Sequence, residues 1–132
     1  MRAKLSVLRA CRRLLRPGGK IAFYTIFIAP AASDADRRRI LALGDPPALA
    51  SSATETELLR SAGFAGIEET DETEAYLRTS RGWYEARQRY AKELRELDGA
   101  QAFEEGQENR RKRIAFIEAG LQRRALFVAV RP

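Results

Sequence analysis

An uninterrupted apolar segment near the N-terminus constrains the fold of this chain more than any other feature. Residues 20–28 read Lys-Ile-Ala-Phe-Tyr-Thr-Ile-Phe-Ile, a run rich in β-branched and aromatic residues with almost no alternation of apolar and polar positions. Strands of this composition usually lie in a sheet that is covered on both sides. We therefore expect a strand over residues 20–28 that is buried on both faces and has neighbouring strands on each side.

The segments around this strand alternate between helical and extended patterns. Apolar side chains recur at helical spacing over residues 3–15, with arginines on or near the other face, and Pro17-Gly18-Gly19 then ends the helix. Thr54-Glu55-Thr56-Glu57 matches a capping box before a short helix that Gly63 ends. The other expected elements are helices over 36–43 (capped by Ser33 or Asp34), 55–62, 74–97 and 100–119, a loop over Gly44-Asp45-Pro46-Pro47, and strands over 67–73 and 126–130.

Composition places the chain among ordinary globular proteins. A length of 132 residues is usual for one domain, and 45% apolar with 32% charged residues is far from the composition of disordered chains. The formal net charge is +6, but most arginines alternate with glutamates, as they do on solvated helix faces. We therefore expect one domain over residues 1–132 with one hydrophobic core.

Cysteine and histidine usage excludes several kinds of site. The chain has one cysteine and no histidine, so an internal disulfide, a Cys/His zinc site and a histidine-based catalytic triad are excluded. Cys11 falls on the apolar stripe of the first helix, where a structural thiol is expected. No apolar run approaches the roughly 20 residues needed to cross a bilayer, and the basic N-terminus lacks the apolar stretch of a signal peptide. We expect a cytoplasmic protein without a metal site.

Two motifs, in a fixed order, resemble a known family. Leu14-Leu15-Arg16-Pro17-Gly18-Gly19-Lys20-Ile21-Ala22-Phe23 resembles the segment around the fifth strand of class I S-adenosylmethionine-dependent methyltransferases of type 11. Thr56-Glu57-Leu58-Leu59-Arg60-Ser61-Ala62-Gly63-Phe64 resembles the helix and Ala-Gly-Phe turn that lead to the sixth strand. The proline of the first motif stops the helix, and its glycines permit a tight reversal into the strand.

This resemblance implies an α/β fold that is part of the Rossmann-like class I methyltransferase fold. In that family the closing seventh strand is antiparallel and inserts between the fifth and sixth, which here correspond to residues 126–130, 21–28 and 67–73. The chain then resembles the C-terminal part of the domain: strands 5, 6 and antiparallel 7 with flanking helices. Residues 74–119 take the place of a helical insertion over the substrate pocket. Trp83, Tyr90, Leu94 and Leu97 define its apolar stripe. The aromatic residues Trp83, Tyr84 and Tyr90 either shape an acceptor site or pack in the core, and Trp83 is the first candidate for an acceptor contact.

The family's cofactor is S-adenosyl-L-methionine, but its binding motif has no counterpart in this sequence. Gly18-Gly19-Lys20 cannot substitute for it, because these residues join a helix to a strand, whereas a glycine loop that cradles a ligand joins a strand to a helix N-terminus. The first four strands of the family fold also have no counterpart. A truncated gene, a split gene or a deliberately shortened chain would each give this sequence. We expect it to be inactive without an N-terminal methyltransferase half or self-association.

With the missing half supplied, the resemblance implies transfer of a methyl group to a small-molecule acceptor. Ligands sit at the carboxyl ends of parallel strands, so Tyr24, Thr25 and Phe27 are candidates to line the acceptor side or only pack the sheet. No catalytic residue is assigned. The acidic residues Glu68, Glu69, Asp71, Glu72 and Glu74 are better explained as an exposed strand edge that discourages sheet-to-sheet pairing.

Two alternative functions remain open at this point. The first is a non-catalytic interaction module that pairs with another chain through the edge of residues 21–28. The second is a small nucleic-acid-binding protein, because the isoelectric point is near 10.0. The basic runs that motivate it, none within a known nucleic-acid-binding motif, are Arg37-Arg38-Arg39, Arg110-Arg111-Lys112-Arg113 and Arg123-Arg124.

Overall fold

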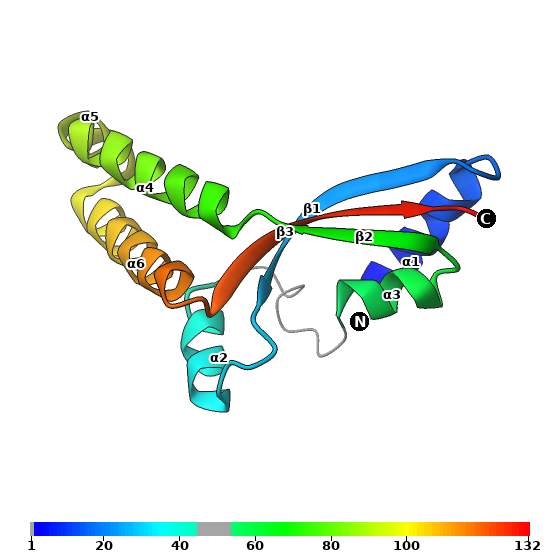
Figure 1. Cartoon of the computed structure of the whole chain (residues 1–132). Coiled ribbons are helices and arrows are strands. Elements are labelled where there is room, and N and C mark those ends of the chain that lie inside the picture. Colours follow the sequence, from blue (N-terminus) through cyan, green and yellow to red (C-terminus); the bar gives the residue numbers. More distant parts are fainter. Residues whose placement is uncertain (1, 45–53) are drawn as a thin grey trace. The chain divides into compact units, whose positions relative to one another are not determined.

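A computed structural model describes residues 2–44 and 54–132 of the chain (Figure 1). The chain divides into two compact units. Unit 1 comprises Met1–Phe27, Pro46–Glu72 and Arg124–Pro132, and unit 2 comprises Ile28–Asp45 and Thr73–Arg123. Gly44 has the positive φ of a turn glycine, at 80°. The rest of the loop predicted over Gly44-Asp45-Pro46-Pro47 lies outside the described residues.

A three-stranded sheet has the predicted topology. Its strands are β1 (Lys20–Ile28), β2 (Ala65–Asp71) and β3 (Gln122–Val130), in the order β1-β3-β2. β3 is antiparallel to β2. β3 also runs antiparallel to β1, because Gly18 N–H donates to Arg131 O at 2.7 Å beyond one end and Ala29 N–H donates to Leu121 O at 2.8 Å beyond the other. β1 and β2 are therefore parallel, and the expected insertion of the closing strand between them is confirmed.

Two of the strands differ from prediction at their ends. β2 begins and ends two residues before the predicted 67–73, and β3 begins four residues before the predicted 126–130. β2 occupies one edge of the sheet, and its acidic side chains Glu68, Glu69 and Asp71 are exposed. The predicted exposed acidic edge is confirmed for these three residues, whereas Glu72 is half-buried beyond the end of β2 and Glu74 lies in α4 (Thr73–Arg89).

Helices α1 (Arg2–Leu14) and α3 (Glu55–Ser61) pack against one face of the sheet in unit 1 (Figure 1). Phe127 is central to this packing, because its ring stacks on Phe23 of β1 with 5.7 Å between the ring centroids. Burying aromatic and aliphatic side chains of this size contributes about 1.5–3 kcal/mol for each. The buried members of the core are Leu8, Leu58, Leu59, Ala62, Phe64, Ala125, Phe127 and Ala129.

The prediction that β1 is buried on both faces is wrong for the described chain. Exposure alternates along the strand: Ile21, Phe23 and Phe27 pack against the core, whereas Tyr24 and Ile26 are 59% and 37% exposed. The reason is that α1 and α3 both contribute to the core on the Phe23 side of the sheet. The unalternating sequence therefore gives β1 a second apolar face that unit 1 leaves in solvent.

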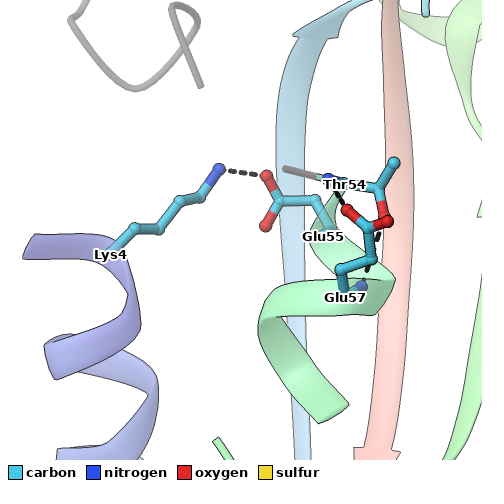
Figure 2. Close-up of polar contacts among 4 residues, drawn as sticks. All are labelled: Lys4, Thr54, Glu55 and Glu57. Carbon is cyan, nitrogen blue, oxygen red and sulfur yellow. Dashed lines mark hydrogen bonds and ion pairs between the residues drawn. The ribbon is translucent and has the colours of Figure 1, made fainter. Parts of the chain in front are cut away.

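Polar contacts fix α1 and α3 beside one another. Lys4 of α1 forms an ion pair with Glu55, the first residue of α3, and the Glu55 carboxylate is buried (Figure 2). The predicted capping box is present, because Thr54 Oγ1 accepts from Glu57 N–H at 3.2 Å and Glu57 Oε2 accepts from Thr54 N–H at 2.9 Å. At the other end of α3, Arg12 Nε donates to the carbonyl of Gly63 at 3.0 Å.

Unit 2 is mainly helical. Its helices are α2 (Asp34–Leu41), α4 (Thr73–Arg89), α5 (Ala91–Asp98) and α6 (Ala100–Glu118), and α4 and α5 both pack against α6. The predicted cap at Ser33 is confirmed. The helix predicted over 74–97 is broken at Tyr90, whose backbone leaves helical geometry at φ −100° and ψ 25°. Buried side chains of the unit include Ile40, Tyr76, Phe103, Gln107 and Ile117.

The apolar stripe of residues 83–97 does not form the core of unit 2. Trp83 is 63% exposed and Leu97 is 80% exposed, and Tyr90 is also exposed. The expectation of core packing is wrong for these residues because α6 meets α4 through other positions, including the pair formed by Gln107 and Gln88. Leu94, the fourth residue of the stripe, is half-buried, so the solvent-facing part of the stripe is Trp83, Tyr90 and Leu97.

Candidate acceptor-side surface

β1 presents the three predicted acceptor residues on two different faces. Tyr24 lies on the exposed face, and the guanidinium of Arg124 from β3 lies over its ring, 5.1 Å from the centroid. Thr25 and Phe27 are half-buried on the opposite face, and Phe27 packs against the core of unit 1. Within unit 1 these residues therefore do not form one lining surface. Their contact with an acceptor stays a prediction.

The fourth predicted residue, Trp83, lies on α4 in unit 2. Its indole is exposed, as an acceptor-contacting side chain would be before a ligand or a partner covers it. Its neighbour Tyr84 is half-buried, and the carbonyl of Tyr84 accepts a hydrogen bond from Gln107 Nε2 at 3.1 Å. A role for Trp83 at an acceptor stays a prediction.

Two polar features were not found from the sequence. Gln122, the first residue of β3, is 1% exposed, and its Nε2 donates to the hydroxyl of Tyr76 at 3.3 Å. Arg124 forms the cation–π contact with Tyr24, which is worth about 0.5–1 kcal/mol at an exposed site. Both residues lie in a strand segment whose sequence alternates only loosely, so their faces could not be read from periodicity.

The glycine turn before β1 does not fit a donor-binding loop. Gly19 N–H donates to Arg16 O at 2.8 Å, and Gly18 N–H donates to the carbonyl of Arg131, so both amides are used within the chain. The turn also precedes a strand rather than a helix N-terminus, where amides and the helix dipole favour a ligand's negative charge. The geometry is that of a structural turn between α1 and β1. The absence of a donor site from this chain stays a prediction.

Other kinds of site were sought over the described residues. These residues contain no group of three or more His, Cys, Asp or Glu side chains that could hold a metal ion. None of the helices in residues 2–44 and 54–132 combines the length and the apolarity that a membrane crossing requires.

Helix arginines pair with carboxylates of the same or a neighbouring helix. Arg81 of α4 meets Glu118 of α6 at 2.9 Å, and Arg95 of α5 meets Glu104 of α6. Such pairing is the pattern of solvated helix faces and argues against a phosphate-binding stripe along these helices. The further pairs are Arg39 with Asp36, Arg78 with Glu74, Arg87 with Asp98, and Arg111 with Glu108.

Comparison with solved structures decides the fold. The chain superposes on phosphoethanolamine N-methyltransferase 2 from Haemonchus contortus with a TM-score of 0.79 and 16% identity, covering 97% of this chain and 30% of that one. The chain has part of the class I methyltransferase fold. Comparisons with family models and with curated proteins give no match.

Two further methyltransferase-fold structures agree with this assignment. Cyclopropane synthase MmaA2 from Mycobacterium tuberculosis matches with a TM-score of 0.79 and 16% identity, over 96% of this chain and 49% of that one. Mycolic acid cyclopropane synthase CmaA1, solved with S-adenosylhomocysteine and CTAB, matches with a TM-score of 0.79 and 14% identity, over 96% and 49%. The chain therefore spans between about a third and a half of the length of these methyltransferase-fold proteins. The fold predicted from the two turn motifs is confirmed.

Proposed function

We propose that this chain is one part of an S-adenosylmethionine-dependent methyltransferase that acts on a small-molecule acceptor. The observation that carries the proposal is the insertion of antiparallel β3 between β1 and β2, in a chain that superposes on solved methyltransferases over nearly its whole length. The match covers only 30% to 49% of those proteins. The proposal therefore assigns the donor site to residues outside this chain.

In this proposal the chain contributes the acceptor side. Tyr24, Thr25, Phe27 and Trp83 would contact or position the acceptor. Methyl transfer depends mainly on holding the donor and the acceptor nucleophile in line, so positioning side chains are sufficient for much of the rate. With no histidine in the sequence, a general base would be a carboxylate, a tyrosine or a group outside the chain.

The missing portion would dock on β1. β1 is the other edge strand of the sheet, and its Tyr24 and Ile26 side chains face solvent. An edge strand offers unpaired N–H and C=O groups to another strand, and an exposed apolar face offers burial to a helix. These two features favour a longer sheet covered on both sides.

A second candidate function rests on the same surface. A non-catalytic interaction module would also use the β1 edge and the exposed Tyr24 face to pair with another chain. The two candidates differ in one property: only the methyltransferase part completes a donor site when it is joined to its missing portion.

The test compares the chain alone with a fusion. The fusion joins the part of CmaA1 that lies outside the match to the N-terminus of this chain, and both proteins are titrated calorimetrically with S-adenosylhomocysteine. We expect no saturable binding to the chain alone and one site per fusion molecule. An Ile26→Asp fusion should lose the site, because the charge would face the docked portion. Lys92→Asp, at an exposed position of α5 in unit 2, is the control for an added carboxylate away from β1. A cooperatively folded fusion that does not bind would contradict the proposal.

A further inference from the structure

Helix α1 carries a second apolar face that the described residues of unit 1 leave largely uncovered. Its first face enters the core through Leu8, which is 5% exposed. Val7 and Leu14, in contrast, are 60% and 87% exposed, Ala3 is exposed and Ala10 is half-buried. Spacings of four, three and four positions place side chains in one row along a helix. We call this row the α1 seam, and it consists of Ala3, Val7, Ala10 and Leu14.

The α1 seam lies on the side of the helix that faces away from α3. Arg12 Nε donates to the carbonyl of Gly63, at the end of α3, at 3.0 Å. Leu14 lies two positions after Arg12, about 160° around the helix axis. Because α3 contacts β2 at one edge of the sheet, the side of α1 away from α3 is the side of β1, the other edge strand.

A row of arginines runs beside the α1 seam. Arg9, Arg13 and Arg16 are exposed and recur four and three positions apart, so they share one face of the helix. In the described part of the chain, none of their guanidinium groups lies within 4.0 Å of a carboxylate. Arginines of α4 and α5, in contrast, meet carboxylates of α6. An apolar row beside a positive row favours a partner that carries carboxylates next to its own apolar face.

An α-helix fits this surface better than a membrane or a second copy of the chain. Small and larger side chains alternate along the α1 seam, so side chains of a second helix can pack beside Ala3 and Ala10. Helices that lie on a bilayer use Trp and Phe on their apolar face, and α1 has no aromatic residue. A second copy of α1 would bring two rows of arginines together, which is unfavourable.

We propose that an amphipathic helix with carboxylates beside its apolar row docks on the α1 seam. The helix belongs to the portion of the methyltransferase domain outside this chain, so its source rests on the proposed function. The place of the seam supports this source, because a strand added at the free edge of β1 requires a helix over its core face. A helix over that strand would lie beside α1, against Val7 and Leu14.

The thiol of Cys11 reports on this surface. Cys11 is the one cysteine of the sequence, is half-buried, and lies four positions after Val7 and three before Leu14. The experiment measures, by mass spectrometry, the rate at which iodoacetamide alkylates Cys11 in the chain and in two variants. Each variant carries, before Met1, a designed helix as long as α1 with a row of Leu and Ala. A Gly-Ser linker of about 15 residues reaches about 20 Å and permits either helix orientation.

The two variants differ only in the charges beside the added apolar row. Glutamates flank the row in one variant and lysines in the other. Tethering gives the added helix a millimolar effective concentration, so we expect the glutamate variant to slow alkylation of Cys11 about tenfold. The lysine variant should alkylate within about twofold of the chain alone, because its charges repel the arginines of α1. Equal rates in the two variants would overturn the proposal.

Two substitutions locate the docked helix. Leu14→Asp in the glutamate variant should restore the alkylation rate of the chain alone. Leu97→Asp is the matched control, because Leu97 is 80% exposed on α5 in unit 2 and the same change there should leave Cys11 protected. Circular dichroism establishes that each variant is folded. Protection that survives Leu14→Asp in a folded variant would overturn the proposal.

The CmaA1 fusion tests the source of the helix separately from the donor site. We expect slower alkylation of Cys11 in the fusion than in the chain alone, and loss of this protection with Leu14→Asp. A folded fusion that binds S-adenosylhomocysteine without protecting Cys11 would overturn the docking and leave the proposed function standing. Protection through Leu14 without S-adenosylhomocysteine binding would support the docking and contradict the proposed function. Capture of the chain by phosphatidylglycerol vesicles, abolished by Leu14→Asp, would assign the seam to a membrane and overturn the proposal.

Discussion

Removing Lys4 should destabilise unit 1 more than neutralising its partner Glu55. Glu55 is 7% exposed, and the side chain of Lys4 is 19% exposed. Glu55 Oε2 is buried and lacks a hydrogen-bond partner in the described residues, so the ion pair is the principal side-chain compensation of this carboxylate. Lys4→Met would leave the carboxylate buried without its cation.

The size of this effect follows from the burial of each partner. Removing one partner of a fully buried ion pair costs about 3–5 kcal/mol. Glu55 begins α3, and the positive end of a helix offsets about 0.3–1 kcal/mol for a carboxylate. Lys4 is partly exposed, which lowers the value further, so we expect about 2–3 kcal/mol for Lys4→Met. Glu55→Gln leaves a lysine that can turn into water and should cost about 1 kcal/mol. The double variant Lys4→Met/Glu55→Met should lie within about 1 kcal/mol of the parent.

The assay is urea unfolding followed by far-ultraviolet circular dichroism, with the free energies compared in a double-mutant cycle. Lys92→Met is the control, because Lys92 is exposed on α5 and such surface changes stay within about 0.5 kcal/mol. A loss below about 0.5 kcal/mol for Lys4→Met, or a larger loss for Glu55→Gln than for Lys4→Met, would refute the reasoning.

Three further predictions concern stability. Gly63→Ala should cost about 1–3 kcal/mol in urea unfolding, because Gly63 has a φ of 89° and the new Cβ would lie 2.8 Å from Arg12 Nε. A cost below about 0.5 kcal/mol, the size of an ordinary surface substitution, would contradict this prediction. Phe127→Ala should cost about 3–5 kcal/mol, since its ring is 3% exposed at the centre of the unit 1 core; a calorimetric melting temperature near that of the parent would count against it. Hydrogen bonding to Arg39 lowers the pKa of Asp36 from its ordinary value of 3.8. The contribution of Asp36 to the free energy of unfolding is therefore complete above pH 3.8 and is lost as pH falls through the pKa of the folded state. Asp36→Asn should remove this contribution to the pH dependence of urea unfolding, and an unchanged pH profile would show that the Arg39 contact does not stabilise the fold.

The sheet order was implied by the resemblance of two turn motifs to class I methyltransferases, whereas the turns themselves could be predicted from local physics. Pro17-Gly18-Gly19 ends α1 and starts β1, and Gly63, with φ of 89°, ends α3 before β2. Each motif acts within a few residues, so neither depends on the rest of the domain. Strand ends were less predictable, because the first residues of β2 and β3 lack an alternating pattern.

The apolar sequence of β1 predicted the strand correctly but its burial wrongly. Its apolar sequence is suited to a sheet with two covered faces, whereas the helices α1 and α3 cover one. The sequence of β1 is therefore typical of a sheet covered on both faces, and unit 1 covers only one of them. The exposed stripe of Trp83 and Leu97 is a similar case, since periodicity reports an apolar face but not what covers it.

The candidates Tyr24, Thr25 and Phe27 follow from their position on a predicted strand, and their contact with an acceptor stays a prediction. The contacts between α4 and α6, such as those of Arg81 with Glu118 and of Gln107 with Gln88, were not predicted. Such side-chain contacts between helices cannot be read from spacing along one helix.

Amide hydrogen exchange along β1 tests most directly whether this chain is one part of a larger methyltransferase sheet. β1 is an edge strand in the described chain, so the amides that point away from β3 should exchange rapidly in the chain alone. In the fusion with the unmatched part of CmaA1 they should become protected by at least about tenfold, because a neighbouring strand would accept their hydrogen bonds. Equal exchange of these amides in the chain alone and in a folded fusion would contradict the account.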